Sequence, residues 1–251
     1  MASSTPDAGR RAELAENYAR VRERIAKACA AAGRDPAEVR LVAVTKTFPA
    51  SDVTLLADLG ITDVGENRDQ EAAPKAAAVA AAGVAVRWHF VGRLQRNKCR
   101  SVVQYADVVQ SVDSVRLAEA LGRAVQRSRA EGGRTDPLEV FVQVSIDGDP
   151  DRGGAWPESA DADRGLLPVV TAVANHPELT LSGLMAVAPL GWAPEAAFDR
   201  LAAIAERVRS EFPEASLLSA GMSGDLEVAI RYGATHVRVG SALLGMRASL
   251  R

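Results

Sequence analysis

The stretch LVAVTK at residues 41–46 is apolar until it ends on a lysine, and the prediction of the fold starts from it. A β-branched run of this kind is typical of a strand that is buried on both faces. Side chains alternate along a strand, so Val42, Val44 and Lys46 share one face. We therefore expect the ammonium group of Lys46 to point the same way as two core valines, where solvent contact is scarce.

Two roles are open for Lys46. Burial lowers the pKa of a lysine because it disfavours the charged form. A neutral lysine is a nucleophile that forms a Schiff base with an aldehyde or a ketone. A lysine at a strand end can instead extend its charged group to water and have no chemical role. The stretch itself does not decide between the two.

Seven more strand-like segments follow, and helical segments lie between them. The alternation predicts βαβ units and a parallel sheet. In the segment 194–212, four apolar residues recur at three- and four-residue spacing, as on a helix with one apolar side: Ala197, Leu201, Ile204 and Val208. The further expected strands are 62–66, 86–92, 107–112, 138–146, 179–188, 216–222 and 236–240. The further expected helices are 51–59, 69–82, 114–130, 224–232 and, shorter, 93–104 and 163–175.

Eight strands and their helices in 251 residues match the size of a (β/α)8 TIM barrel. The competing fold is a doubly wound open sheet, which often carries a glycine-rich fingerprint after its first strand; TKTFP at residues 45–49 is not one. An extra helix precedes the first strand. We predict a flexible tail over residues 1–11, one barrel domain over residues 12–251, and a mobile loop at 147–163 on the active face.

Composition excludes several classes of function. A net charge of −2 gives no general attraction to nucleic acid or to an anionic membrane. No apolar run approaches the roughly 20 residues that a membrane span needs. Cys29 and Cys99 are far apart and suit reduced thiols in a cytoplasmic protein. The three histidines are scattered, so we expect no zinc site.

Small residues follow the seventh and eighth strands, where barrels often bind phosphate. SAGMSG at 219–224 places Ser223 as an expected N-cap, and Gly240-Ser241 forms a second tight turn. Ordinary βα turns remain the alternative. Arg238 alternates with two valines and is expected to face into the barrel, where it needs an acceptor. The acceptor is a carboxylate such as Glu66 or a ligand atom.

One cofactor fits all three of these features. They are a lysine that can react with a carbonyl group, two turns that can bind phosphate, and an arginine that faces into the barrel. Pyridoxal 5'-phosphate (PLP) has an aldehyde, a phosphate and a ring nitrogen, and an arginine is among the ring-nitrogen partners of this cofactor. A phosphosugar Schiff-base aldolase would use the lysine and the two turns but has no evident need for Arg238.

At these residues the chain resembles the pyridoxal phosphate homeostasis protein family (YggS/PROSC type), which is related to the N-terminal barrel of alanine racemase. The motifs that carry the resemblance are VTKT (44–47), GENR (65–68), WHFVGRLQRNK (88–98), GLMA (183–186), SAGMSGD (219–225) and VRVG (237–240). The resemblance implies that Lys46 carries PLP, that Arg238 meets the pyridine nitrogen and that Asn67 lies near the ring. It also implies that the phosphate is surrounded by Ser219, Met222, Ser223, Gly240 and Ser241.

This sequence departs from the family after the fifth strand. Arg152 stands where relatives usually have lysine, and Ser145 stands where many have asparagine. Arg152 keeps the positive charge but cannot form an imine. The departures put a role of this loop in doubt, but not cofactor binding.

We expect a cofactor carrier without catalytic residues. A cationic arginine beside the pyridine nitrogen opposes ring protonation and weakens the ring as an electron acceptor. Racemisation also needs acid–base groups on both faces of the substrate, and we expect no second domain to supply the opposing tyrosine. The alternative is a PLP-dependent amino-acid racemase. Expected partners are PLP and, transiently, apo forms of PLP enzymes, with a monomeric carrier.

The segment after the third strand is basic. Arg93, Arg96 and Arg100 share one side of an expected helix, with Lys98 nearby. A solvated surface and a docking site for an anionic partner are both open. Nucleic acid is disfavoured because the run is short and lacks aromatic residues that stack on bases.

Overall fold

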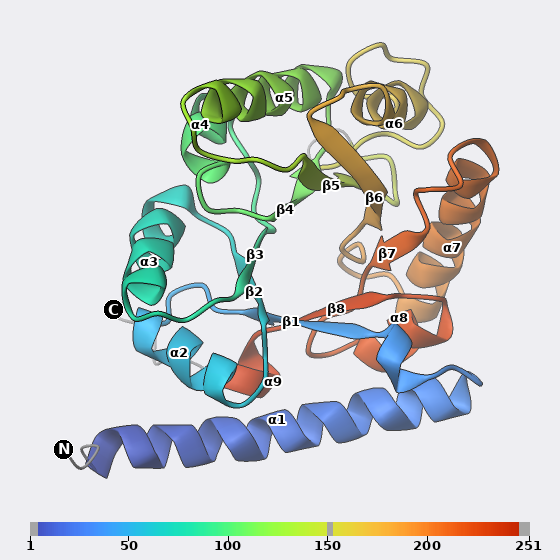
Figure 1. The fold of residues 1–251 in the computed structure, drawn as a ribbon. Coiled ribbons are helices and arrows are strands. Elements are labelled where there is room, and N and C mark those ends of the chain that lie inside the picture. Colours follow the sequence, from blue (N-terminus) through green and yellow to red (C-terminus); the bar gives the residue numbers. More distant parts are fainter. Residues whose placement is uncertain (1–4, 150–152, 246–251) are drawn as a thin grey trace.

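The computed structural model describes residues 5–149 and 153–245, and its centre is a closed barrel of eight parallel strands (Figure 1). Each strand pairs with its neighbour in sequence, and β1 closes the ring on β8 with Val42 opposite Arg238. The predicted (β/α)8 barrel is confirmed, and the open sheet is wrong. The strands are β1 Arg40–Val44, β2 Asp63–Glu66, β3 Arg87–Phe90, β4 Val108–Val112, β5 Leu138–Gln143, β6 Leu179–Met185, β7 Leu217–Ser219 and β8 His236–Val239.

Helices surround the barrel (Figure 1), and their apolar sides are buried in the core against it. The predicted apolar side of α7 is confirmed, since its four residues at three- and four-residue spacing are all buried. The helices are α1 Thr5–Ala31, α2 Ala50–Asp58, α3 Asp69–Ala81, α4 Cys99–Val102, α5 Val115–Ala130, α6 Leu166–Ala174, α7 Pro194–Glu211, α8 Leu226–Arg231 and α9 Ser241–Leu244. Two short 3-10 helices are η1 Pro36–Glu38 and η2 Arg96–Lys98.

The expected tail over residues 1–11 is wrong from Thr5 onward, because α1 already begins there. Arg10 anchors this first part of the helix: its guanidinium donates to the carboxylate of Asp52 at 2.7 Å and to the carbonyl of Leu244 at 3.0 Å. Residues 1–4 lie outside the described part. The long helix runs along one side of the barrel (Figure 1) and packs mainly on α8 and α9.

Several strands end earlier than the sequence predicts. β1 ends at Val44, and the backbone N–H of Phe48 donates to the carbonyl of Thr45 at 3.1 Å, which closes a turn around Lys46. β6 ends at Met185 and β7 at Ser219. The apolar pattern continues past these points, but the chain must leave the sheet to reach the next helix.

The insert after β5 is packed where the structure describes it. Ala155 is fully buried and pairs with the end of β5: its N–H donates to the carbonyl of Gln143 at 2.7 Å, and its carbonyl accepts from Ser145 at 3.0 Å. The expectation of a loose loop therefore does not hold for residues 153–163. Arg152, at which the sequence departs from the family, lies outside the described residues.

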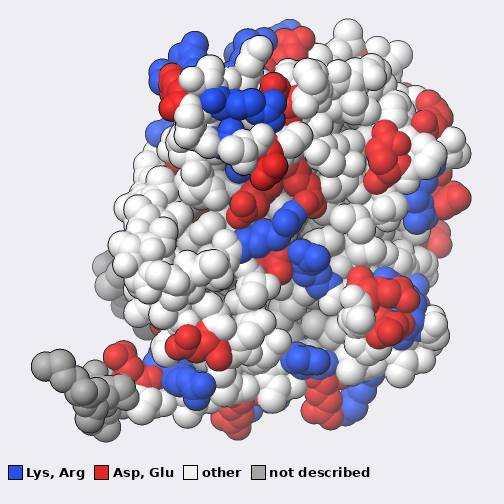
Figure 2. Space-filling view, in the orientation of Figure 1, with Lys and Arg blue, Asp and Glu red and all other residues white. Residues whose placement is uncertain are grey.

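The strands follow one another clockwise in Figure 1, so with right-handed crossovers their amino ends face the reader. Charged side chains of both signs gather over the middle of this face (Figure 2). The ion pairs here include Arg40 with Asp63 at 3.2 Å and Arg87 with Glu139. Residues after the carboxyl ends of the strands, including Lys46, belong to the opposite face, where barrels place their sites.

Within the described ranges, none of the helices combines the length and the apolarity that a bilayer crossing requires.

Candidate cofactor site at the carboxyl ends of the strands

Lys46 lies in the turn after β1, and its side chain is exposed. The expected burial of Lys46 is therefore wrong, because β1 ends two residues before it. The face of the strand was predicted correctly: Ala43, on the alternate face, packs outward in the core with α1 and α2 residues, and Val42 is buried opposite Arg238. The amine of Lys46 is thus open to a ligand from solvent.

Arg238 is the buried cation at the centre of the site, with 5 % of its surface exposed. Val237 and Val239 pack outward against the helices, so the prediction that Arg238 faces inward is confirmed. Its guanidinium donates to the hydroxyl and the carbonyl of Ser219 and to the carbonyl of Ala186, each at 2.8 Å. Burial lowers the pKa of Arg238 to about 10, so it stays charged at neutral pH.

The hydrogen bonds of Arg238 show whether Glu66 is its partner and how many of its N–H groups stay unpaired. None of its hydrogen-bond acceptors among the described residues is a carboxylate, so Glu66 is not its partner. A guanidinium carries five N–H groups. These three hydrogen bonds leave two N–H groups without an acceptor in the described part of the chain, which fits a ligand acceptor at this point.

A directed chain of hydrogen bonds crosses the barrel interior from Arg238. The Ser219 hydroxyl accepts from Arg238 and donates to the side-chain oxygen Oε1 of Gln110 at 2.7 Å. The Gln110 amide donates to Nδ1 of His89 at 2.8 Å, and Nε2 of His89 donates to Asp63 at 2.9 Å. Ser219, Gln110 and His89 each accept from one neighbour and donate to the next, and Asp63 accepts the last hydrogen bond. The orientation of Arg238 is therefore determined through four buried side chains.

Asp63 ends this chain as a carboxylate. Burial opposes its ionisation, but hydrogen bonds from His89 and Arg40 and the charge of Arg40 outweigh burial and lower the pKa of Asp63 to about 2. His236 lies in the same interior, with its ring 5.2 Å from that of Phe141. Burial lowers the pKa of His236 to about 3, so it is neutral.

The two expected phosphate turns lie side by side. The N–H of Ala242, after β8, donates to the hydroxyl of Ser223, after β7, at 3.3 Å. The prediction that Ser223 is the N-cap of α8 is wrong. Asp225 takes that position and accepts from the N–H of Met222 at 2.6 Å. The N–H groups of Ser223 and Gly224 have no acceptor among the described residues, which leaves them free for an anion.

The remaining predicted site residues line these turns. Met222 is exposed at 40 %, Ser241 is exposed, and Gly240 is partly buried. Gly221 adopts a φ of 88°, and a Cβ there would lie 2.6 Å from Cβ of Ala229, so the turn needs glycine.

Asn67 follows β2 on the same face and is partly buried. A Cβ on Gly92, after β3, would lie 2.1 Å from the carbonyl oxygen of Asn67, so the two strand ends touch through backbone. The side-chain amide of Asn67 makes no hydrogen bond to another residue of the described ranges, so it is available to a ligand.

Two residues of the site are absent from the sequence prediction. Gln110, in the buried run VVQSV of β4, connects His89 to Ser219. Lys75, on the alanine-rich helix α3, donates to the carbonyl of Thr45 beside Lys46. In both cases the sequence signal is a polar residue within a mostly apolar run.

The basic segment after β3 is not one helix. η2 and α4 divide it, and Arg93 precedes both. Arg100 and Lys98 have acidic neighbours at 3.7 and 3.8 Å. Arg93 and Arg96 line a groove of about 1020 Å³ beyond β3, β4 and β5, together with Arg164 and other residues.

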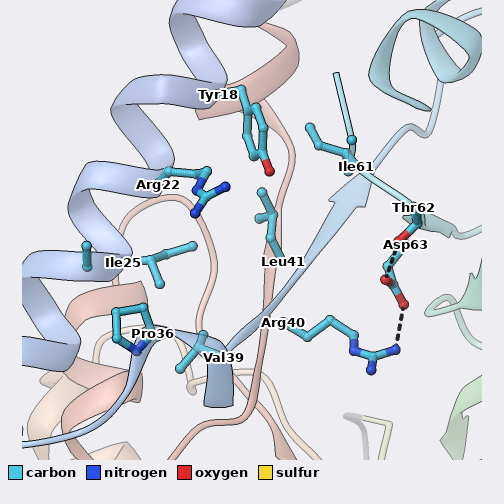
Figure 3. A pocket seen from close by; sticks show the side chains of 12 residues that line it. Tyr18, Arg22, Ile25, Pro36, Val39, Arg40, Leu41, Ile61, Thr62 and Asp63 are labelled. Carbon is cyan, nitrogen blue, oxygen red and sulfur yellow. Dashed lines mark hydrogen bonds and ion pairs between the residues drawn. The ribbon is translucent and has the colours of Figure 1, made fainter. Parts of the chain in front are cut away.

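A smaller cavity of about 250 Å³ lies between α1 and the amino ends of β1 and β2 (Figure 3). Tyr18 and Arg22 reach over it from α1, while Leu41 and Ile61 form its apolar wall. It lies at the opposite end of β1 from Lys46 and is separate from the candidate site. Among the described residues, no group of three His, Cys, Asp or Glu side chains is placed to hold a metal ion.

Comparison with known proteins agrees with this geometry. The alanine racemase N-terminal domain family model matches residues 11–248. The pyridoxal phosphate homeostasis protein of Mycobacterium tuberculosis is 48 % identical over 98 % of this chain and 96 % of its own length; that of Escherichia coli is 36 % identical over 94 % and 97 %.

Solved structures agree as well. PipY of Synechococcus elongatus, solved with PLP bound, has a TM-score of 0.76 and 32 % identity, covering 92 % of this chain and all of its own. An alanine racemase of Clostridium difficile, at 11 % identity, has a TM-score of 0.67 over 95 % of this chain and 58 % of its own, a likeness of fold. The resemblance predicted from the motifs is therefore confirmed, and the chain belongs to the pyridoxal phosphate homeostasis protein family.

Proposed function

We propose that this protein binds PLP at the carboxyl ends of its strands, holds it as a Schiff base on Lys46, and serves PLP homeostasis in the cytoplasm. The observation that carries the proposal is the buried Arg238. Neutral acceptors determine its orientation, and two of its N–H groups have no acceptor in the part of the chain that the structure describes. Relatives named for PLP homeostasis and the PLP-bound PipY support it. The buried free thiols of Cys29 and Cys99 fit a reducing compartment.

Different residues would bind the aldehyde, the phosphate and the ring nitrogen of the cofactor. PLP supplies an aldehyde that reacts reversibly with amines. The Lys46 amine adds to the aldehyde carbon; the oxygen leaves as water with the two amine protons, and a C=N bond remains. The N–H groups of Ser223 and Gly224, with the Ser241 hydroxyl, would hold the phosphate. Arg238 would donate to the pyridine nitrogen.

The same arrangement supports a carrier rather than an enzyme. An arginine that donates to the pyridine nitrogen keeps that nitrogen unprotonated, and the ring then accepts electrons poorly. A racemase also needs an acid–base group opposite Lys46. Tyr105 donates to Asp69 near α3, and burial raises its pKa far above its usual range. Tyr18 lies on α1 and Tyr232 follows α8, away from the mouth.

Absorbance and reductive trapping test the proposal. The protein mixed with PLP should turn yellow, and borohydride should fix the cofactor on Lys46. Lys46→Ala should lose both signals, whereas Lys27→Ala, which alters an exposed lysine of α1, should keep them. Trapping on another lysine in Lys46→Ala would overturn the site assignment. A protein that stays colourless but cleaves a phosphosugar would be an aldolase.

Two further measurements separate a carrier from an enzyme. Loss of chirality or deuterium exchange at Cα of an amino acid, with the PLP-loaded protein, would favour the racemase. We expect neither, and we expect the loaded protein to activate an apo PLP enzyme faster than free PLP does. Its sedimentation should be that of a monomer.

A further inference from the structure

The turn that carries Lys46 is strained and is fastened on both sides. Thr47, directly after Lys46, adopts a φ of 67° and is the one non-glycine residue with positive φ in the described ranges. This conformation is unfavourable for a β-branched residue. Such strain persists only where surrounding contacts over-determine the backbone, and it is common at functional sites.

The contacts that fasten the turn come from β2 and α3. The N–H of Thr47 donates to the carboxylate of Glu71 at 3.3 Å. On the other side of Lys46, the Thr45 hydroxyl donates to Glu66 at 2.7 Å, and the ammonium group of Lys75 donates to the Thr45 carbonyl at 2.8 Å. Lys75 is also paired with Glu66.

The Glu66–Lys75 pair lies on the outer side of the barrel sheet, between the strands and α3, and does not face the barrel mouth. Val64, two residues before Glu66, packs outward with the helices, and Lys75 belongs to α3. The side chain of Glu66 is 1 % exposed and that of Lys75 is 7 % exposed, so neither is accessible to a ligand at the mouth. Their contact with the site runs through Thr45.

A contribution to fold stability does not by itself explain why this ion pair is buried here. A buried ion pair must overcome the desolvation of both charges, and apolar replacements of similar size are often as stable. Oε2 of Glu66 is buried and has no hydrogen-bond partner in the described part of the chain, which adds a further cost. A role in shaping the turn explains why two charges are kept there.

We propose that Glu66 and Lys75 are positioning residues: by holding both the hydroxyl and the carbonyl of Thr45, they keep the strained turn in place and the Lys46 amine directed to the aldehyde of PLP. The inference rests on the proposed function. It assigns the rate of C=N bond formation, with release of water, to residues that never touch the cofactor.

A matched pair of variants tests the Thr45 contact. Thr45→Val keeps the shape and loses the hydroxyl, whereas Thr45→Ser keeps the hydroxyl. We expect Thr45→Val to slow the appearance of the yellow colour by about tenfold or more, as expected for a misplaced nucleophile, and Thr45→Ser to react like the unchanged protein. Equal rates for Val and Ser would overturn the role of Thr45.

The double variant Glu66→Leu/Lys75→Met tests the pair itself. Noncovalent PLP binding is measured with Lys46→Ala added, by quenching of tryptophan fluorescence. We expect slow C=N formation with unchanged noncovalent binding, and partial rescue of the rate by Thr47→Gly, because glycine adopts positive φ without strain. Loss of noncovalent binding, or no rescue, would indicate a merely structural pair.

The outcomes keep the two proposals apart. If the unchanged protein never traps PLP on Lys46, the proposed function fails whatever the variants do. If it traps PLP there and the variants react equally fast, only the positioning role fails. Should the double variant not fold, the comparison of Thr45→Val with Thr45→Ser decides alone.

Discussion

Acid should destabilise the barrel through His236, well before the interior carboxylate of Asp63 is protonated. Burial lowers the pKa of His236 from 6.5 to about 3. The folded state therefore keeps a neutral ring at a pH where the unfolded chain binds a proton. A lowered histidine pKa contributes stability that is complete above pH 6.5 and is lost as the pH falls toward 3.

The size of the effect follows from these values. Each pH unit between the two pKa values costs about 1.4 kcal/mol, so the free energy of unfolding should fall by about 3 kcal/mol between pH 7 and pH 4. Asp63 contributes little in this window. Its pKa of about 2 lies below the ordinary 3.8, and its contribution is lost only as the pH falls from that range toward 2.

Urea unfolding at pH 7 and pH 4, followed by tryptophan fluorescence, measures the loss. His236→Phe is the test variant, because an apolar ring can occupy the space beside Phe141 and cannot take up a proton. The substitution also removes the hydrogen bond between Nδ1 of His236 and the Thr235 hydroxyl, which are 3.0 Å apart. We expect the variant to lose about 3 kcal/mol less than the unchanged protein over this range. An equal loss in both would refute the reasoning and assign the acid sensitivity to other groups.

Two more outcomes are expected from changes near the site. Ser219→Ala removes an acceptor of Arg238 and breaks the interior chain, so the dissociation constant of PLP should rise about tenfold in an absorbance titration; unchanged affinity would contradict the role of the chain. Gly92→Ala would place a Cβ 2.1 Å from the carbonyl oxygen of Asn67 and should lower the free energy of unfolding by about 1–3 kcal/mol in urea, while Gly224→Ala, with no atom within 4 Å of its Cβ, should cost much less.

The barrel was predictable because its signals are local. Strands buried on both faces are continuous apolar runs, and helices between them repeat at three and four residues, as at Leu201 and Ile204. The inward direction of Arg238 followed from alternation with Val237 and Val239, and the structure confirms it.

The rest of the site depends on contacts between residues far apart in the chain. Where β1 ends decides that Lys46 is exposed, and that end is set by the turn at Thr45 rather than by apolar content. Gln110 and Ser219 meet across 109 positions, and Lys75 reaches Thr45 across 30. The spacing of apolar and polar residues along the chain does not predict such pairs. They become evident only in the closed barrel.

The two polar networks together fit the proposed role of holding a cofactor. One lies inside the barrel and orients Arg238; the other lies outside it and fastens the turn of Lys46. A PLP enzyme needs a group that takes and returns a proton at the substrate carbon. Around Arg238 the hydrogen-bond acceptors are two carbonyls and one hydroxyl, none of which serves as a base at neutral pH. The contacts that orient Arg238 and those that fasten the turn of Lys46 fit the proposed role, in which the protein stores a reactive aldehyde until an amine elsewhere takes it.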